Sequence, residues 1–258
     1  ESHALAKPNV VIFNTLLNAY AKRGNAHGAL KILEVMDRYT DSMREGRESD
    51  KIRADEHTLN GVLYALSVGG TSSTSSSTEG DAVRASTILQ RLERSHVKGD
   101  WISKPTTRSY SLLINACGNR HRGASTEEER REALGIALDA FGRLQASKYA
   151  DADSSTYACL IRACGKLLST SSTGDGEEGD NAEEMERGEK VGWLFRKCCE
   201  EGLVDEVVLR NFVRAAPGMV VEDILGKFVE SRMKGRGNRV VVSMLPSEWT
   251  ALASKTVK

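Results

Sequence analysis

One apolar pattern recurs five times along this chain and limits its fold more than any other feature. Each copy places apolar or small residues at i, i+3, i+4 and i+7, the spacing of one face of an α-helix. The five sets are Phe13/Leu16/Leu17/Tyr20, Leu59/Val62/Leu63/Leu66, Tyr110/Leu113/Ile114/Cys117, Tyr157/Leu160/Ile161/Cys164 and Leu209/Phe212/Val213/Ala216. An alanine precedes the last member in every copy: Ala19, Ala65, Ala116, Ala163 and Ala215. We therefore expect the same tight helix contact to be made five times.

A second amphipathic helix follows each of the first four copies. Its apolar sets are Ala29/Ile32/Leu33/Met36, Ala85/Ile88/Leu89/Leu92, Ala137/Ala140/Phe141/Leu144 and Val191/Leu194/Phe195/Cys198, with a less regular fifth around Leu225/Phe228/Val229. A single helical hairpin cannot bury such a stripe, whereas stacked hairpins form one continuous core. The sequence thus predicts an all-α array of helical hairpins.

The repeats differ in length because of insertions between them. Equivalent positions in the first helices lie 46, 51, 47 and 52 residues apart. Segments 69–80 and 169–181 are rich in Ser, Thr and Gly, and 120–125 is polar, so we expect solvated loops inside three hairpins. Segment 39–51 is expected to prolong a helix with charged residues. The acidic run 177–189 is interpreted as a solvated loop at the mouth of a helix.

Charge and hydropathy limit the classes of function. Lys plus Arg and Asp plus Glu each total 36, giving a net charge of zero, so nucleic-acid binding would depend on where charges are placed. No stretch approaches the roughly 18 apolar residues of a membrane helix, and we expect no membrane partner. The first residue is Glu1, which is typical of a fragment or a processed chain.

The sequence gives no sign of metal or catalytic chemistry. Cys117 and Cys164 occupy equivalent stripe positions and are interpreted as core residues, as is Cys198. Cys159 and Cys199 have no His or Cys companion at zinc-binding spacing. We find no Gly-rich phosphate loop, nucleophile elbow, His-Glu-x-x-His motif or paired-Asp nuclease signature. We expect no metal, no cofactor and no enzyme activity.

The segment 10–36, with VVIFNTLLNAYAKRG at its start, resembles a pentatricopeptide repeat. Copies near Thr107 and Ser154 resemble its first helix well, and those near Glu56 and Glu206 are degenerate. The resemblance implies a right-handed superhelical solenoid, similar to tetratricopeptide arrays. It divides the chain into a leader or remnant of a preceding repeat (1–9), five repeats (10–55, 56–106, 107–153, 154–205 and 206–245) and a terminal helix (246–258). Pro246 would start this last helix, and Trp249 would pack on the fifth repeat.

The same resemblance implies two base-reading residues in each repeat. One follows the aromatic position of the first helix, and the other immediately precedes the next repeat. The implied pairs are Asn14 with Asp55, Asn60 with Thr106, Ser111 with Asp153, and Ala158 with Asp205. By resemblance the first pair favours uracil and the third guanine. Ala158 has no polar group and should discriminate poorly, and Arg210 is expected to cap the array or contact phosphate.

Two further sets of contacts are implied. Residues near the start of each first helix would stack on bases: Val11, His57, Arg108, Ser155 and Val207. Basic residues near the end of the first helix would contact phosphate: Lys22, Arg120 and Lys166. The alternative for each of these cations is a favourable interaction with the helix dipole.

Two functions remain at this point. The first is a single-stranded RNA-binding protein of a mitochondrion or chloroplast that serves RNA processing, stability or translation. The second is a protein-binding scaffold, such as a non-catalytic subunit of a ribosome or RNA-processing complex. Neutral charge and the degenerate repeats favour the scaffold, whereas the repeated reading pairs favour RNA as the partner.

Overall fold

A computed structural model describes residues 8–42, 52–68, 80–98, 104–119, 126–169, 177–230 and 241–253, and all regular structure in these ranges is helical. The prediction of an all-helical repeat fold is confirmed. The chain divides into two compact units, Glu1–Arg122 and Gly123–Lys258. We describe each unit by itself, so the right-handed superhelix stays a prediction.

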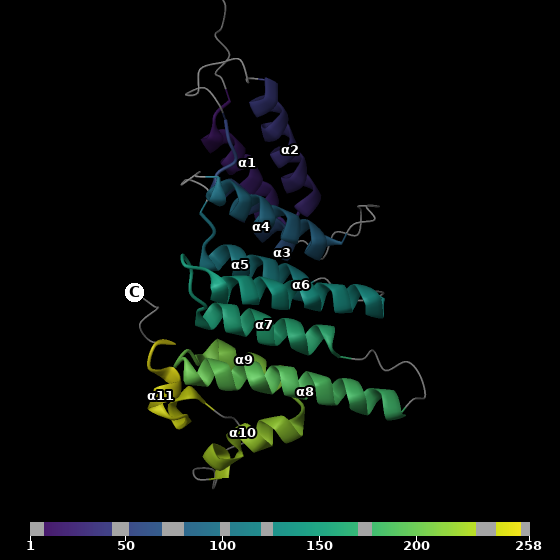
Figure 1. The fold of residues 1–258 in the computed structure, drawn as a ribbon, viewed down its shortest axis with the longest axis vertical. Coiled ribbons are helices and arrows are strands. Elements are labelled where there is room, and N and C mark those ends of the chain that lie inside the picture. The colour runs from purple at the N-terminus through teal and green to yellow at the C-terminus, as the bar shows by residue number, and fades with distance from the viewer. Residues whose placement is uncertain are drawn as a thin grey trace, which may run out of the picture. The chain divides into compact units, whose positions relative to one another are not determined.

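The first unit contains two complete helical hairpins and the first helix of a third. The hairpins are α1 (Val10–Lys22) with α2 (Ala26–Ser42) and α3 (Glu56–Val68) with α4 (Asp81–Val97), followed by α5 (Thr107–Asn119). The first helices α1, α3 and α5 pack in sequence, and α2 and α4 lie against them as a second layer. Figure 1 shows this order in purple and blue. The core between the layers contains Leu17, Met36, Leu63, Leu89 and Leu92, none more than 1% exposed.

The second unit repeats this arrangement and ends with shorter elements. It contains α6 (Glu127–Ala146), α7 (Ser154–Leu167), α8 (Glu177–Glu200), α9 (Glu206–Ala215), α10 (Gly218–Glu230), a 3-10 turn (Val242–Met244) and α11 (Ser247–Thr250). Helix α7 packs against α6, α8 and α9. The rings of Phe195 and Phe212 stack with centroids 3.9 Å apart, and this pair joins α8 to α9.

The first helices α3, α7 and α9 each begin after a capping aspartate. Asp55, Thr106, Asp153 and Asp205 stand immediately before α3, α5, α7 and α9. These positions are also the last residues of the first four predicted repeats. The repeat divisions themselves stay predictions. The first hairpin turns at Gly24, whose φ of 65° is one that residues with a side chain rarely adopt.

Burial follows the predicted apolar sets, with exceptions at the two ends of the series. Ala65, Ala116, Ala163 and Ala215 are at most 9% exposed, as expected for tight helix contacts. The expectation is wrong for Ala19, which is exposed together with Leu16 and Tyr20. The Tyr20 ring lies against Gly28 of α2 and is partly covered by it. Val213 is likewise 44% exposed, because no further first helix follows α9 among the described residues.

The acidic run was wrongly predicted to be a loop. Helix α8 begins at Glu177 and includes residues 177–189. Alanine, glutamate and methionine are good helix formers. Pairs four and three residues apart add support, because Lys190 Nζ lies 2.5 Å from Glu186 Oε1 and Arg187 Nη2 lies 3.5 Å from Glu184 Oε1. Helix propensity therefore outweighs net charge here.

The terminal helix is also shorter than predicted. Pro246 caps a helix of only four residues, Ser247–Thr250. Trp249 packs edge-on against Phe195 of α8 and Phe228 of α10, so it joins the fourth hairpin to the fifth. Helix α2 extends as far as Ser42. Several parts of the predicted segments lie outside the described residues: 43–51, 69–79, 120–125 and 254–258.

Candidate nucleic-acid interface

The predicted base-stacking residues share one structural position. Each is the second residue of a first helix, and all are exposed: Val11, His57, Arg108, Ser155 and Val207. Val11 is 70% exposed. A side chain at the open start of a helix is accessible to a flat ligand. The sequence pattern therefore placed these residues at accessible positions within each unit.

The first reading pair is joined by a residue that the sequence analysis missed. Thr58, fully buried, places its hydroxyl 2.7 Å from Asn14 Oδ1 and 2.8 Å from Asp55 Oδ1. Asp55 Oδ1 also accepts the backbone N–H of Thr58 at 2.8 Å. Among the described residues, Asn14 Nδ2 and Asp55 Oδ2 have no hydrogen-bond partner. One donor and one acceptor are thus held next to each other.

The second pair is arranged differently, because a carboxylate lies between its members. Asn60 Nδ2 donates to Glu56 Oε1 at 2.9 Å, and the Thr106 hydroxyl donates to the same oxygen at 3.1 Å. Asn60 is 8% exposed, and its Oδ1 is buried with no partner among the described residues. Glu56 therefore engages one donor of Asn60 and the hydroxyl of Thr106, and burial withholds Asn60 Oδ1 from a ligand. The glutamate at the first position of α3 was the signal that the sequence analysis overlooked.

The third pair is divided between the two units, and the fourth has no polar first member. Ser111 belongs to the first unit and Asp153 to the second, so their pairing stays a prediction. Ala158 is 3% exposed and its carbonyl accepts a hydrogen bond from Asn211 Nδ2 at 2.9 Å. A buried alanine presents no group to a base. Arg210 is exposed on α9.

Each aspartate among the second members also caps the helix that follows it. Asp153 Oδ1 accepts the backbone N–H and the hydroxyl of Thr156, both at 2.7 Å. Asp205 Oδ1 accepts the N–H groups of Val207 and Val208 at 2.9 and 2.7 Å. Such N-caps satisfy helix donors that would otherwise be unpaired. Helix capping alone thus accounts for an aspartate at these positions, and the spacing Asp-x-x-Thr marks the caps at Asp55 and Asp153 in the sequence.

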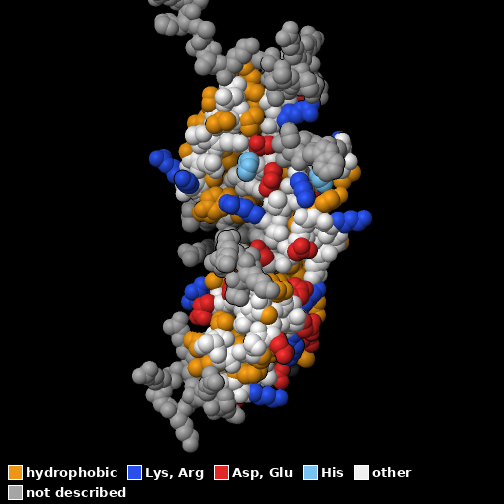
Figure 2. Space-filling view, turned by 90° about the vertical axis from the view of Figure 1, so that its left-hand side faces the viewer, with side chains coloured by type: hydrophobic (Ala, Val, Ile, Leu, Met, Phe, Trp, Pro, Cys, Tyr) orange, Lys and Arg blue, Asp and Glu red, His pale blue; other side chains and the backbone are white. Residues whose placement is uncertain are grey.

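The predicted phosphate contacts are only partly described. Lys22 and Lys166 are exposed near the ends of α1 and α7. Arg120 lies outside the described residues. The face in Figure 2 mixes lysine and arginine with aspartate and glutamate in its described part, without a continuous stripe of one sign. This distribution agrees with the net charge of zero.

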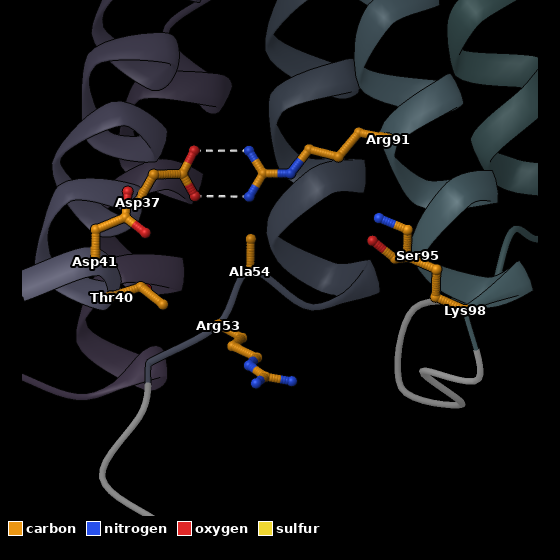
Figure 3. A pocket seen from close by; sticks show the side chains of 8 residues that line it. All are labelled: Asp37, Thr40, Asp41, Arg53, Ala54, Arg91, Ser95 and Lys98. Atoms are coloured by element: carbon orange, nitrogen blue, oxygen red, sulfur yellow. Dashed lines mark hydrogen bonds and ion pairs between the residues drawn. The ribbon is translucent and has the colours of Figure 1, made fainter. Parts of the chain in front are cut away.

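A pocket in the first unit is lined by residues of α2, α4 and the stretch that precedes α3. It measures about 740 Å³ and is lined by Asp37, Thr40, Asp41, Arg53, Ala54, Arg91, Ser95 and Lys98. Figure 3 shows Arg91 of α4 directed at Asp37 of α2, with two hydrogen bonds of 2.7 and 2.6 Å. The Asp37 hydrogen bonds raise the pKa of Arg91. The pair joins two second helices, which is a structural role.

The cysteines lie in the core. Cys117, Cys164 and Cys198 are 0% exposed, and Cys199 is 5% exposed. Burial raises the pKa of Cys117 and of Cys164 to about 12, which keeps both thiols protonated and unreactive. Cys159 is partly buried. Among the described residues, no group of three or more His, Cys, Asp or Glu side chains could hold a metal ion.

Comparison with known families gives one match. The family model of the pentatricopeptide repeat matches residues 6–37. The chain carries a pentatricopeptide repeat. The match includes α1 and most of α2, and it supports a protein of the pentatricopeptide repeat family. Comparisons with curated proteins and with solved structures gave no match. None of the described helices combines the length and the apolar character that crossing a membrane would require.

Proposed function

We propose that this pentatricopeptide repeat protein binds single-stranded RNA, with its first repeat as the principal base-reading unit. The observation that carries the proposal is the pair Asn14 and Asp55. The Thr58 hydroxyl lies 2.7 Å from Asn14 Oδ1 and 2.8 Å from Asp55 Oδ1, and its single hydrogen is shared between these two acceptors. Asn14 also lies within the segment that the family model matches.

The chemistry of this pair suits the edge of a base. The Asn14 amide can donate from Nδ2, and the Asp55 carboxylate can accept at Oδ2, directly or through water. Val11, which is 70% exposed one helical turn earlier, offers an aliphatic face for stacking. Because Thr58 fixes both reading side chains, little side-chain entropy remains to be lost on binding.

The other repeats are expected to contribute unequally. Glu56 occupies the donors of Asn60 and Thr106, so the second repeat should not read a base while that carboxylate is in place. The fourth repeat presents a buried Ala158. We therefore propose weak overall affinity and a base preference set mainly by the first repeat.

A pair of asparagines on the same helix provides a matched test. Asn14 is in the reading pair, whereas Asn18 is an exposed residue one turn later. Binding of short uridine-rich and adenosine-rich RNAs should be followed by fluorescence anisotropy for the unmodified chain, Asn14→Ala and Asn18→Ala. Loss of one or two hydrogen bonds should weaken uridine-rich binding by Asn14→Ala roughly 2- to 12-fold. Asn18→Ala should leave it unchanged.

Other results would contradict the proposal. Equal effects of the two substitutions, or equal binding of both RNAs that disappears with salt, would mean non-specific charge contact. No binding at tens of micromolar would favour the protein-binding scaffold. Action on organellar transcripts in a mitochondrion or chloroplast is part of the proposal, and imaging of a tagged full-length protein would test it.

A further inference from the structure

The orientation of the Asn14 amide depends on a hydroxyl group from another helix. Thr58 is 0% exposed at the third position of α3, and its Oγ1 lies 2.7 Å from Asn14 Oδ1 on α1. The oxygen and nitrogen ends of an amide are nearly alike in shape, so hydrogen bonds decide which end faces which way. Thr58 is thus the neighbour that holds the Asn14 oxygen inward and leaves Nδ2 directed away from it.

The hydrogens around Thr58 show how firmly this orientation depends on its hydroxyl. The single hydroxyl hydrogen is shared between Asn14 Oδ1 and Asp55 Oδ1. Asp55 Oδ1 also accepts the Thr58 backbone N–H at 2.8 Å, whereas Asn14 Oδ1 has no second donor among the described residues. The Asp55 backbone N–H points to Thr58 Oγ1 at 3.3 Å, so an Asn14 nitrogen turned toward this oxygen would compete with it. Without the hydroxyl, nothing described would distinguish the two amide orientations.

The order of donor and acceptor across the pair distinguishes two pyrimidines. With Oδ1 held inward, Asn14 offers the donor Nδ2, and Asp55 offers the acceptor Oδ2 beside it. Uracil has an acceptor at O4 next to a donor at N3–H, whereas cytosine has an amino donor at C4 next to the acceptor N3. The order in the pair therefore complements uracil. A flipped Asn14 amide would place two acceptors side by side, and this arrangement would lose the preference.

We propose that Thr58 is a specificity-determining residue that holds the Asn14 amide with its donor outward and thereby favours uracil over cytosine. The inference rests on the proposed function, because it concerns the same reading pair. Thr58 is fully buried, so it acts by positioning Asn14 and does not touch the RNA itself.

The test measures the ratio of the dissociation constants for oligocytidine and oligouridine by fluorescence anisotropy, below the melting temperature of every variant. Thr58→Val removes the hydroxyl and frees the amide to adopt both orientations. The competent fraction then falls to about half, and the opposite orientation no longer rejects cytosine, so the ratio should fall roughly 2- to 5-fold. Thr58→Ala should lower the ratio as much, which separates the lost hydroxyl from the packing of the valine methyl. Thr58→Ser keeps the hydroxyl and should retain the ratio.

Thr156 at the start of α7 provides the matched control. It is also 0% exposed, and its hydroxyl donates to Oδ1 of the capping Asp153 at 2.7 Å. Thr156→Val should lower the melting temperature, as Thr58→Val does, and leave the ratio unchanged. In the Asn14→Ala background, Thr58→Val should cause no further fall in the ratio, because Thr58 acts through Asn14.

The two ways of failing are distinguishable. If Asn14→Ala lowers the ratio but Thr58→Val and Thr58→Ala do not, the role of Thr58 is overturned while the proposed function stands. If Asn14→Ala leaves the ratio unchanged, both are overturned. An equal fall of the ratio in Thr58→Val and Thr156→Val would also overturn the role of Thr58, since general destabilisation would then explain it.

Discussion

The contact between α7 and α9 makes a sharp prediction about one glycine. A Cβ added to Gly165 would stand 2.5 Å from the Cβ and 2.9 Å from the Cα of Ala215. The second of these atoms belongs to the backbone and cannot rotate away. Gly165→Ala must therefore separate the two helices, at a cost of about 1–3 kcal/mol for overpacking. Against this, alanine favours a helix over glycine by about 0.5–1 kcal/mol.

Gly142 on α6 provides the matched control. A Cβ there would meet no atom within 4 Å, so Gly142→Ala should gain only the helix term of about 0.5–1 kcal/mol. The difference between the two variants isolates the clash, about 1–3 kcal/mol, or roughly 2–12 °C in melting temperature. Urea unfolding followed by circular dichroism measures both. If Gly165→Ala stabilises the chain as much as Gly142→Ala, the close approach of α7 and α9 is wrong.

Two further predictions concern a carboxylate and two thiols. Glu56→Ala should free the donors of Asn60 and Thr106 and tighten RNA binding roughly 2- to 10-fold. Glu56→Gln keeps an acceptor and should tighten binding less. Weaker binding by Glu56→Ala in anisotropy titrations would contradict this prediction. Burial raises the pKa of Cys117 and Cys164 from 9.0 to about 12, so their stabilising effect is complete below about pH 9 and is lost as pH rises toward 12. Each thiol should lower the free energy of unfolding by up to about 1.4 kcal/mol per pH unit in that window. Urea midpoints between pH 8 and 10.5 should fall less steeply in the Cys117→Ala/Cys164→Ala variant, and an unchanged slope would contradict the assignment.

Residue patterns predicted some contacts of the candidate site and missed others. The resemblance pointed to Asn14 and Asp55, and periodicity located the helices that hold them. Neither indicated Thr58, whose hydroxyl reaches back to Asn14 across 44 positions in the chain. The contacts of Glu56 were not predicted for the same reason, because its partners Asn60 and Thr106 lie at the start of different helices. A hydrogen bond between repeats depends on how their helices pack, and the sequence of one repeat does not specify that packing.

Local composition gave a wrong prediction where high net charge and helix propensity favoured different structures. The run 177–189 is acidic and was assigned to a loop, yet α8 contains it. Its charges are spaced so that lysine and arginine follow glutamate by three or four residues. These pairs form only once the helix exists, so net charge was a poor guide and spacing a better one.

The sequence by itself determined most of the helices and their order, because helix periodicity is a local property of neighbouring residues. The five alanines illustrate what it could not determine. Ala19 and Ala65 occupy the same place in the pattern, but Ala19 is exposed while Ala65 is 0% exposed. Burial requires a partner surface, and α1 packs against α3 where Ala65 is buried, whereas Ala19 on α1 is left exposed. Only the tertiary structure decides which copies of a repeated stripe are covered.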